Sequence, residues 1–297
     1  MLVSIIIPTY NSLSKLRQAL ASLEIIDFPR ADFEVVVVDD GSTDQTPVFL
    51  ADYGSGTPLL FRYFRQPNRG PAAARNLAIR HARGDYLLSI DADCFVDRDI
   101  LNRYLRHFPC PNLAGVGGDV LPEKTNVVSR YLDYIGVWRP GAIAGEIRYL
   151  VTANAFFCKK ALLEVGGFDE DFRFPGGEEP EMCHRLRRKG YFFRYENEAK
   201  VVHAHRTNLK SFIHMFKMHG IGCRICASKW EDFAISTRTM RGNLLGKTLP
   251  AFTMRAGSQV GVISAVFFAG LEYVRLLSYY RGYHMKLSLP GENPTAP

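Results

Sequence analysis

Continuous apolar runs and helix-like segments alternate along the first hundred residues. The runs predict strands buried on both faces of a sheet, at residues 2–7, 33–38, 59–64 and 86–90. Between them, leucines at positions 13, 16, 20 and 23 fall on one helical stripe, and residues 71–82 predict a second helix that Gly84 ends. Because strands that alternate with helices build a mainly parallel sheet with helices on both faces, the pattern predicts an α/β fold.

The pattern weakens between residues 119 and 145, where prolines and glycines surround Tyr131, Tyr134 and Trp138. This segment is either a mobile lid or a packed aromatic cluster, and the sequence favours neither. Regular patterns return beyond it. They predict strands at residues 149–158 and 200–205, helices at 159–165 and 180–189, and an amphipathic helix at 209–230.

Length and charge limit the function only broadly. The chain of 297 residues is long enough for one large domain or two modest ones. Its formal net charge of +7 and pI near 9.1 indicate affinity for something anionic. Nucleotide phosphates, acidic lipid headgroups and nucleic acid all qualify, and net charge does not choose among them.

Cysteine spacing argues against a structural zinc site. Of the six cysteines, only Cys223 and Cys226 have a CxxC spacing, and no second pair of this kind accompanies them, so reduced thiols are expected. The first residues lack the positive start, long apolar core and cleavage site of a signal peptide. We therefore expect a cytoplasmic protein.

Two carboxylates follow the predicted strand at residues 86–90. Asp91 and Asp93 are separated by one residue, so on a continuing strand they would project to the same side. Ligands of open α/β sheets collect beyond the carboxyl ends of the strands, where this pair would lie. Paired carboxylates favour a hard cation such as Mg²⁺ or Mn²⁺, although a solvated turn after a strand can have the same sequence.

Six motifs occur in an order that resembles the family 2 glycosyltransferases, which have the GT-A fold. Together they span residues 3–205, about two-thirds of the chain. They are SIIIPTYN at residues 4–11, DDGSTD at 39–44, NRGPAAARN at 68–76, DAD at 91–93, VGGFD at 165–169 and GEEPEMCHRL at 177–186. The resemblance implies an inverting, metal-dependent transfer of a sugar from a nucleotide-diphosphate donor to a hydroxyl acceptor.

The resemblance also implies which residues bind the nucleotide sugar. Asp39 is expected to contact the base and Asp40 the nucleoside, while Arg75 lies on a helix whose amino end could approach the diphosphate. The alternatives to these binding roles are structural: helix capping by residues 42–44 after Asp39, and a surface salt bridge of Arg75. Asp91 is expected to contact the ribose, or the metal through water. The full set is Pro8, Thr9, Tyr10, Asp39, Asp40, Arg75, Asp91 and Ala92.

The implied cofactor is Mn²⁺ or Mg²⁺, with Asp93 as a direct ligand. His203 and His205 alternate along a predicted strand, so their imidazoles share a face. In several family members a histidine at the corresponding place completes the metal site, which makes His203 the stronger candidate of the two. A purely structural histidine pair is the alternative.

The stretch GGEEPE at residues 176–181 contains the expected catalytic base. A residue before proline avoids helical geometry, so we expect Glu179 to be extended, just ahead of a helix that opens at Pro180. The resemblance implies that Glu179 is the base and that Asn154, Glu178 and Glu181 lie on the acceptor side. The family usually has Asp at the position of Glu179, so the chain departs from the pattern there. The alternative is that Glu178, Glu179 and Glu181 have no catalytic role and only favour the start of a helix.

These motifs suggest a domain organisation. A GT-A catalytic domain is expected at residues 1–205, with a nucleotide-binding part at 1–118 and an acceptor-binding part at 119–205. A helical extension at 206–285 and a disordered tail at 286–297 would follow. The expected partners are the nucleotide-diphospho-sugar donor and a saccharide or lipid-linked acceptor, without nucleic acid, and a homo-oligomer is left open.

The carboxyl-terminal region suggests contact with a membrane. Residues 256–271 contain no charged residue, but these 16 residues fall short of the ~20 needed to cross a bilayer. Tyrosines and leucines after them are interleaved with Arg275, Arg281 and Lys286, as in a helix that lies in the membrane interface. We expect peripheral attachment to the inner face of the cell membrane. The alternative is a helical hairpin packed on the catalytic domain or on a second copy of the chain.

Two other functions fit parts of the sequence. A donor-binding protein without activity, acting as a membrane-associated partner, would explain Glu179 in place of aspartate. A nucleotidyltransferase would need a glycine-rich, basic loop near the amino end, and PTYN at residues 8–11 is not such a loop.

Overall fold

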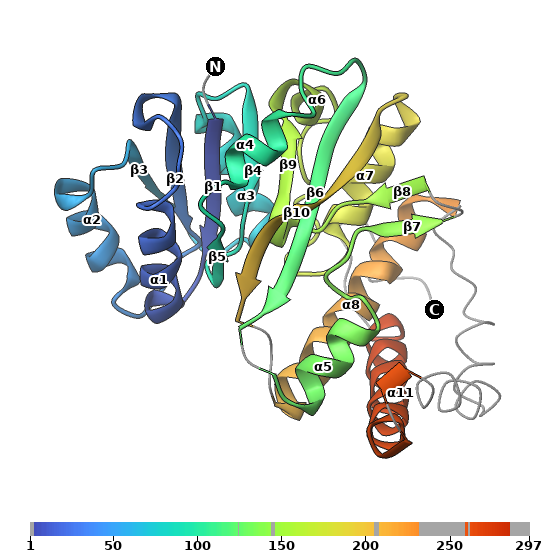
Figure 1. The fold of residues 1–297 in the computed structure, drawn as a ribbon. Helices are drawn as coiled ribbons and strands as arrows, with labels where there is room; N and C mark the ends of the chain where they lie inside the picture. Colours follow the sequence, from blue (N-terminus) through green and yellow to red (C-terminus); the bar gives the residue numbers. More distant parts are fainter. Residues whose placement is uncertain are drawn as a thin grey trace, which may run out of the picture. The chain divides into compact units, whose positions relative to one another are not determined.

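The computed structural model describes residues 3–123, 125–143, 146–204, 208–231, 259–260 and 262–285. The predicted strands form part of an eight-stranded sheet (Figure 1). In spatial order its strands are β3 (Phe61–Arg65), β2 (Phe33–Asp39), β1 (Val3–Thr9), β4 (Tyr86–Ser89), β9 (Ala155–Cys158), β6 (Leu113–Pro122), β10 (Phe192–His203) and β5 (Cys94–Val96). A separate hairpin consists of β7 (Gly141–Ile143) and β8 (Glu146–Tyr149).

Most neighbouring strands near the amino end run parallel. β3, β2, β1 and β4 are mutually parallel, β9 is antiparallel to both β4 and β6, and β10 is parallel to β6. The short β5 closes the sheet antiparallel to β10. Because the carboxyl ends of parallel strands meet at one edge, the residues that follow Thr9, Asp39 and Ser89 lie along that edge.

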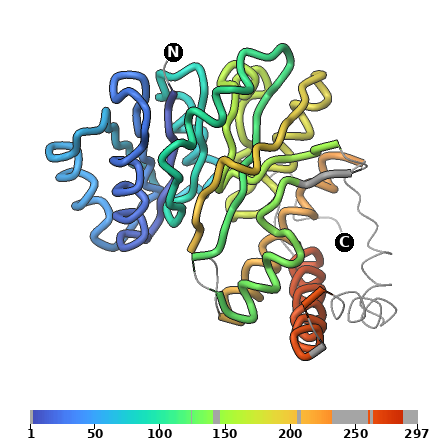
Figure 2. Tube along the Cα trace, in the orientation of Figure 1, coloured from blue at the N-terminus to red at the C-terminus, as the bar shows by residue number. Residues whose placement is uncertain are grey.

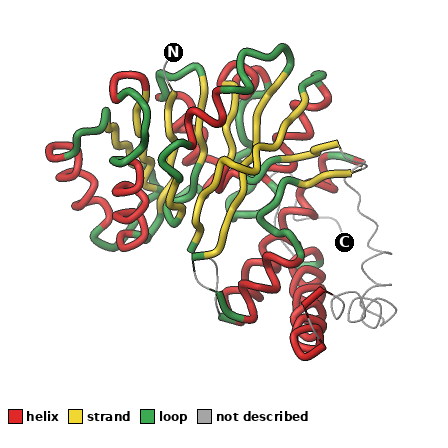
Figure 3. Tube along the Cα trace, in the orientation of Figure 1, coloured by secondary structure: helices red, strands yellow, loops and turns green. Residues whose placement is uncertain are grey.

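Helices cover both faces of the sheet (Figure 3). Three leucines of the stripe on α1 (Leu13–Leu23), at positions 16, 20 and 23, are buried and pack with the face of β1 that carries Ile5 and Ile7. The helix α4 (Ile100–Leu105) joins the same core. The helix α3 (Pro71–His81) packs on β1 and β2 from the opposite face, and its run of buried alanines allows a close approach. The remaining helices of this part are α2 (Thr46–Gly56), α6 (Lys159–Glu164) and α7 (Glu178–Arg188), with 3₁₀ turns at Arg30–Asp32 and Thr152–Asn154.

The chain divides into two compact units. The first comprises Met1–Glu123, Gly136–Arg173 and Glu178–His205 and contains the sheet. The second comprises Lys124–Ile135, Phe174–Gly177 and Arg206–Pro297. The predicted domain boundaries at residues 118 and 205 stay a prediction, and the predicted tail at 286–297 lies outside the described residues.

In the described part of the second unit, the helices α5 (Val127–Tyr134), α8 (Leu209–Lys229) and α11 (Val262–Tyr283) pack together (Figure 2). The buried ring of Tyr131 on α5 lies 5.8 Å from the ring of Phe212 and 5.5 Å from that of Phe268. This aromatic packing corresponds to the second of the two alternatives for the segment 119–145. Among the described residues, no helix is both long enough and apolar enough to span a bilayer.

Two predicted elements differ from the structure. The strand predicted at residues 149–158 is interrupted, because Thr152–Asn154 forms a 3₁₀ turn between β8 and β9. In this turn, the buried side chain of Asn154 donates hydrogen bonds to the backbone carbonyls of residues 119 and 199, which belong to other segments. The strand predicted at 200–205 begins earlier, at Phe192, and its alternation is broken by a register shift against β6.

Candidate functional site

The carboxyl edge of the parallel strands brings together the acidic motifs that the sequence singled out. β1 ends at Thr9 and β2 at Asp39, whereas β4 ends at Ser89, two residues before Asp91. The chain turns after β4, where the backbone N–H of Cys94 donates to the carbonyl of Asp91 at 3.1 Å. The prediction that Asp91 and Asp93 project from a continuing strand is therefore wrong, since the strand stops before them.

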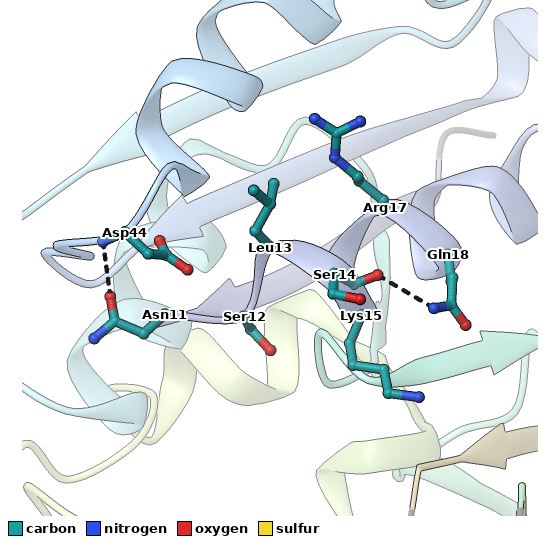
Figure 4. A pocket seen from close by; sticks show the side chains of 8 residues that line it. All are labelled: Asn11, Ser12, Leu13, Ser14, Lys15, Arg17, Gln18 and Asp44. Atoms are coloured by element: carbon teal, nitrogen blue, oxygen red, sulfur yellow. Dashed lines mark hydrogen bonds between the residues drawn. The ribbon is translucent and has the colours of Figure 1, made fainter.

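At the end of β1, Tyr10 presents a half-exposed ring, while Thr9 is buried and Pro8 is partly buried. The next residue, Asn11, ties this end of β1 to the loop after β2. Its side-chain oxygen accepts hydrogen bonds from the backbone N–H groups of Thr43 (2.8 Å) and Asp44 (3.3 Å), the second of which is drawn in Figure 4. The two loops at this edge are thus held as one surface.

An open groove of about 810 Å³ starts at Asn11 and runs along the first turns of α1 (Figure 4). It is lined by Asn11, Ser12, Leu13, Ser14, Lys15, Arg17, Gln18 and Asp44. None of the residues predicted to bind the nucleotide sugar lines it. We therefore assign the groove no role in donor binding.

Asp39 and Asp40 are both buried and both bonded. Asp39 accepts a hydrogen bond from the backbone N–H of Ser42 at 2.8 Å and forms an ion pair with Arg65 at 3.1 Å. Asp40 accepts from the side chain of Gln66 (2.7 Å) and from the backbone N–H groups of residues 69 (2.9 Å) and 70 (2.8 Å). Asp40 therefore organises the loop that leads into α3, and a contact of either carboxylate with the nucleoside stays a prediction.

Arg75 on α3 is a buried charge at the centre of two ion pairs. One guanidinium nitrogen lies 2.9 Å from Asp91 and the other 3.1 Å from Glu178, the first residue of α7. Burial alone would lower the pKa of Arg75, but the carboxylates of Asp91, Glu178 and Glu179 more than offset it and raise that pKa above its ordinary value. Arg75 thus forms a buried ion pair rather than a surface one, and its predicted contact with the diphosphate stays a prediction.

A second cluster forms where β5 begins and β10 ends. Asp93 and Cys94 face His203 across the sheet, and the three potential ligand atoms lie within 4.8 Å of one another. The carboxylate of Asp93 is 3.3 Å from Nε2 of His203, and the ring of Trp138 packs 4.4 Å from the His203 ring. Packing of this kind fixes the orientation of an imidazole. His205, the other histidine candidate, lies outside the described residues.

The residues of this cluster fit a hard divalent cation. A carboxylate oxygen and an imidazole nitrogen, brought together from distant parts of the chain, are ligands that Mn²⁺ accepts. Burial, together with the nearby Asp91 and Asp93 carboxylates, raises the pKa of the Cys94 thiol well above its ordinary value. Oxygen and nitrogen donors suit a hard cation better than sulfur, so Asp93 and His203 are the stronger candidate ligands.

Glu179 lies in the first turn of α7, which begins at Glu178. The prediction that it is extended ahead of a helix opening at Pro180 is wrong. Proline is tolerated in a first turn, where its missing N–H is not needed, and the turn into the helix is made instead by Gly176 and Gly177 with φ of +123° and +103°. The hydroxyl of Thr152 donates a hydrogen bond of 2.9 Å to the Glu179 carboxylate, which is partly exposed.

The three residues predicted on the acceptor side are buried and have partners within the protein. Asn154 accepts a 2.6 Å hydrogen bond from Tyr104 and donates to the carbonyls of residues 119 and 199. Glu178 pairs with Arg75, and Glu181 pairs with Arg185 at 2.7 Å within α7. These contacts favour structural roles, and contact with an acceptor stays a prediction for each.

Sequence reasoning did not identify two residues that support the site. Thr152 donates a hydrogen bond to Glu179, but in the sequence it resembles an ordinary strand residue. The one signal for a role in the site was its position two residues before Asn154. Trp138 packs on His203, and the sequence showed it only as part of an irregular aromatic segment. Both contacts join residues far apart in the chain, so no local pattern reveals them.

Comparison with known proteins places this geometry in a family. Residues 4–166 match Glycosyl transferase family 2, and residues 86–281 match Glycosyl transferase family group 2. The pre-mycofactocin glycosyltransferase of Mycobacterium tuberculosis is 30% identical over 273 residues, which cover 89% of this chain. The same alignment covers 56% of that relative, so the chain spans little more than half of its length.

Two solved structures share the fold. The mannosyltransferase PcManGT from Pyrobaculum calidifontis, in complex with GDP-Man and Mn²⁺, superposes with a TM-score of 0.69 at 20% identity and covers 95% of this chain and 86% of its own. Residues 1–349 of TarS from S. aureus, in complex with UDP-GlcNAc, superpose with a TM-score of 0.56 at 17% identity and cover 95% of this chain and 90% of their own. The architecture is therefore the GT-A fold that the sequence predicted. The match to Glycosyl transferase family 2 extends from β1 through α6 and covers more than half of the chain. The chain therefore belongs to glycosyltransferase family 2.

Proposed function

We propose that the protein transfers a sugar from a nucleotide-diphosphate donor to a hydroxyl group of a saccharide or lipid-linked acceptor, with inversion at the anomeric carbon. The observation that carries this proposal is the double ion pair of buried Arg75. It joins Asp91, in the acidic motif expected at the diphosphate, to Glu178, the neighbour of the candidate base Glu179. This double pairing supports the proposal, because it links the motif expected at the diphosphate to the helix turn that contains the candidate base.

On the donor side, the half-exposed ring of Tyr10 offers a surface for a nucleobase beside Asp39 and Asp40. Asp93 and His203 would hold Mn²⁺ or Mg²⁺. A bound cation of this kind supplies charge neutralisation for the diphosphate as it leaves. The support from relatives is that PcManGT was solved with GDP-Man and Mn²⁺, and TarS with UDP-GlcNAc.

On the acceptor side, Glu179 takes the proton of the acceptor hydroxyl. The freed oxygen attacks the anomeric carbon as the bond from that carbon to the diphosphate oxygen breaks, and the nucleoside diphosphate leaves with the electron pair. A single displacement inverts the configuration and needs one base and no covalent nucleophile. The hydrogen bond from Thr152 orients the carboxylate for this step.

We also propose that the protein attaches peripherally to an anionic membrane through its second unit, and two observations support this. Residues 206–297 contain 12 Lys and Arg but only 4 Asp and Glu, whereas residues 1–205 contain 25 and 26. The whole positive excess of the chain therefore lies in its carboxyl-terminal third. Basic residues near an anionic bilayer each contribute about 1 kcal/mol of attraction.

The second observation is an exposed apolar face on α11. Ile263 is 78% exposed, and Val266 and Phe267 are each 61% exposed, at a spacing that places them on one side of the helix. Tyr273 continues this face and is 45% exposed. An apolar helix face within a basic region suits the boundary between lipid headgroups and acyl chains. A lipid-linked acceptor would be presented at the same surface.

The first prediction concerns the metal. We expect Mn²⁺ to raise the affinity of the wild type for UDP or GDP, and Asp93→Asn to remove most of that increase, because the amide is a poorer ligand than the carboxylate. Calorimetric titration of each nucleotide with and without Mn²⁺ measures this. Asp97→Asn, a partly exposed acid that pairs with Arg103, is the matched control. Equal affinities in the wild type with and without Mn²⁺ would contradict the metal assignment.

The second prediction concerns the base. Glu179→Gln should lower turnover ~10²- to 10⁴-fold, because the amide keeps the shape but cannot take a proton. Nucleotide affinity should stay within about twofold, since the proposal gives Glu179 no contact with the nucleotide. Turnover is measured as release of UDP from UDP-GlcNAc or of GDP from GDP-Man over an acceptor panel, with the exposed Glu198→Gln as control.

Two results would count against this assignment of the base. If Glu179→Gln is fully active while Glu178→Gln or Glu181→Gln is not, the motif has been matched in the wrong register. If the wild type binds UDP or GDP with Mn²⁺ but turns over no donor in the panel, the protein is instead a donor-binding partner without activity.

The third prediction concerns the membrane. At low salt the full chain should float with phosphatidylglycerol vesicles and not with phosphatidylcholine vesicles, and Val266→Glu combined with Phe267→Glu should abolish flotation. Leu163→Glu, which changes an exposed leucine of α6, should have no effect. A wild type that stays in the soluble fraction as a dimer, and that the double substitution converts to a monomer in light scattering, would show that this face binds a second copy.

A further inference from the structure

Helix α8 makes unusually close contact with the loop that leads into α7. Gly222 of α8 lies so near this loop that a Cβ atom added to it would be 1.7 Å from the carbonyl oxygen of Gly176 and 3.2 Å from the Cα of Gly177. Real Cβ atoms are essentially never found within 3.0 Å of another heavy atom. Any side chain at position 222 would therefore displace either the loop or the helix by about 1.3 Å.

Neighbouring residues on the same face of α8 hold the loop as well. Cys226, one turn after Gly222, directs its thiol to the carbonyl of Gly177 at a sulfur–oxygen distance of 3.5 Å. His219, one turn earlier, packs its ring against Gly176, where an added Cβ would lie 2.6 Å from its Cδ2. Positions 219, 222 and 226 recur at the spacing of one helical face. The loop thus rests on α8 at both of its glycines.

The opposite side of α8 is closed by α11. A Cβ added to Gly220 would be 2.0 Å from the carbonyl oxygen of Tyr279, and one added to Gly282 would be 1.9 Å from that of Lys217. Backbone meets backbone on this side, so α8 cannot move away from the loop without displacing α11 as well. We therefore expect Gly176 and Gly177 to absorb strain introduced at Gly222.

These two glycines come directly before Glu178 and Glu179. Upstream, the loop is fixed at Arg173, whose backbone is packed against Gly70. Downstream, Glu178 is fixed by Arg75 at 3.1 Å. Between these two anchors, α8 contacts the chain at Gly176 and Gly177. The positive φ angles of both glycines allow the backbone to turn there into α7.

We propose that Gly222 and Cys226 of α8 are positioning residues for Glu179, acting through the backbone of Gly176 and Gly177. The proposal rests on the function proposed above, in which Glu179 is the base. A misplacement of a reacting group by ~1 Å can lower turnover ~10²-fold without loss of binding.

The test is Gly222→Ala, with Gly270→Ala as the matched control. Gly270 is also a helical glycine, but an added Cβ there meets nothing within 4 Å, so both changes gain the same helix propensity and only one creates a clash. We expect Gly222→Ala to lower turnover ~10²-fold. The calorimetric affinity for UDP or GDP with Mn²⁺ should stay within about twofold of the wild type, and Gly270→Ala should match the wild type in both.

A double-substitution cycle separates positioning from general damage. In the Glu179→Gln background, Gly222→Ala should cause little further loss, because the group on which it acts is already absent. If Gly222→Ala does not fold, Cys226→Ala replaces it, with a smaller loss of turnover expected in the same direction and the same dependence on Glu179.

The outcomes distinguish this inference from the proposed function. Wild-type turnover in Gly222→Ala, or an equal further loss in the Glu179→Gln background, overturns the positioning role while leaving Glu179 as the base. Full activity of Glu179→Gln alone overturns the proposed base, and the positioning role with it.

Discussion

One buried positive charge holds the candidate site together. The guanidinium of Arg75 is enclosed between α3, the turn after β4 and the start of α7, and it pairs with a carboxylate from each of the last two. A buried charge that loses one of its partners is strongly destabilised, by ~3–5 kcal/mol in comparable cases. Each carboxylate is therefore kept in place by the cost of leaving the guanidinium unpaired. Asp91 and Glu178, which come from different motifs, become parts of one rigid arrangement.

The segment that leads to the candidate base Glu179 is fixed at several points, and tight backbone contacts recur at them. Gly70 at the start of α3 lies against Arg173, and Asn76 of the same helix donates a 2.8 Å hydrogen bond to the carbonyl of Phe168. Gly222 of α8 lies against Gly176. Glycine at these places permits an approach that any side chain would prevent. Precise placement of one carboxylate is what a single-displacement transfer demands.

The sequence predicted the architecture well because the relevant signals are local. Continuous apolar runs identified the buried strands β1 and β2, and the leucine stripe of α1 identified its core-facing side. Local rules failed where contacts from distant segments decide the structure. The preference of a residue before proline for extended geometry was overridden at Glu179, since two glycines with positive φ already make the turn into α7. Alternation alone also could not show that β4 ends at Ser89, before Asp91 and Asp93.

Contacts between distant residues also explain what the sequence left out of the site. The motif indicated that Arg75 is important. It did not indicate that two carboxylates would pair with its guanidinium. Asn154 and Glu181 were expected near an acceptor because their motifs resemble those of the family, yet the structure gives both of them buried partners. Thr152, Trp138 and Gly222 have no sequence signature of their own. Each acts through a neighbour that the chain reaches only after folding.

The most direct test of the central claim is Arg75→Lys, measured both for Mn²⁺-dependent affinity for UDP or GDP and for turnover at saturating donor. Lysine keeps the charge but cannot pair with two carboxylates in a fixed fork. If Arg75 joins the donor and base ends of the site, both affinity and turnover fall. A variant that loses nucleotide affinity but keeps wild-type turnover at saturation would contradict this, because Arg75 would then act on the nucleotide alone.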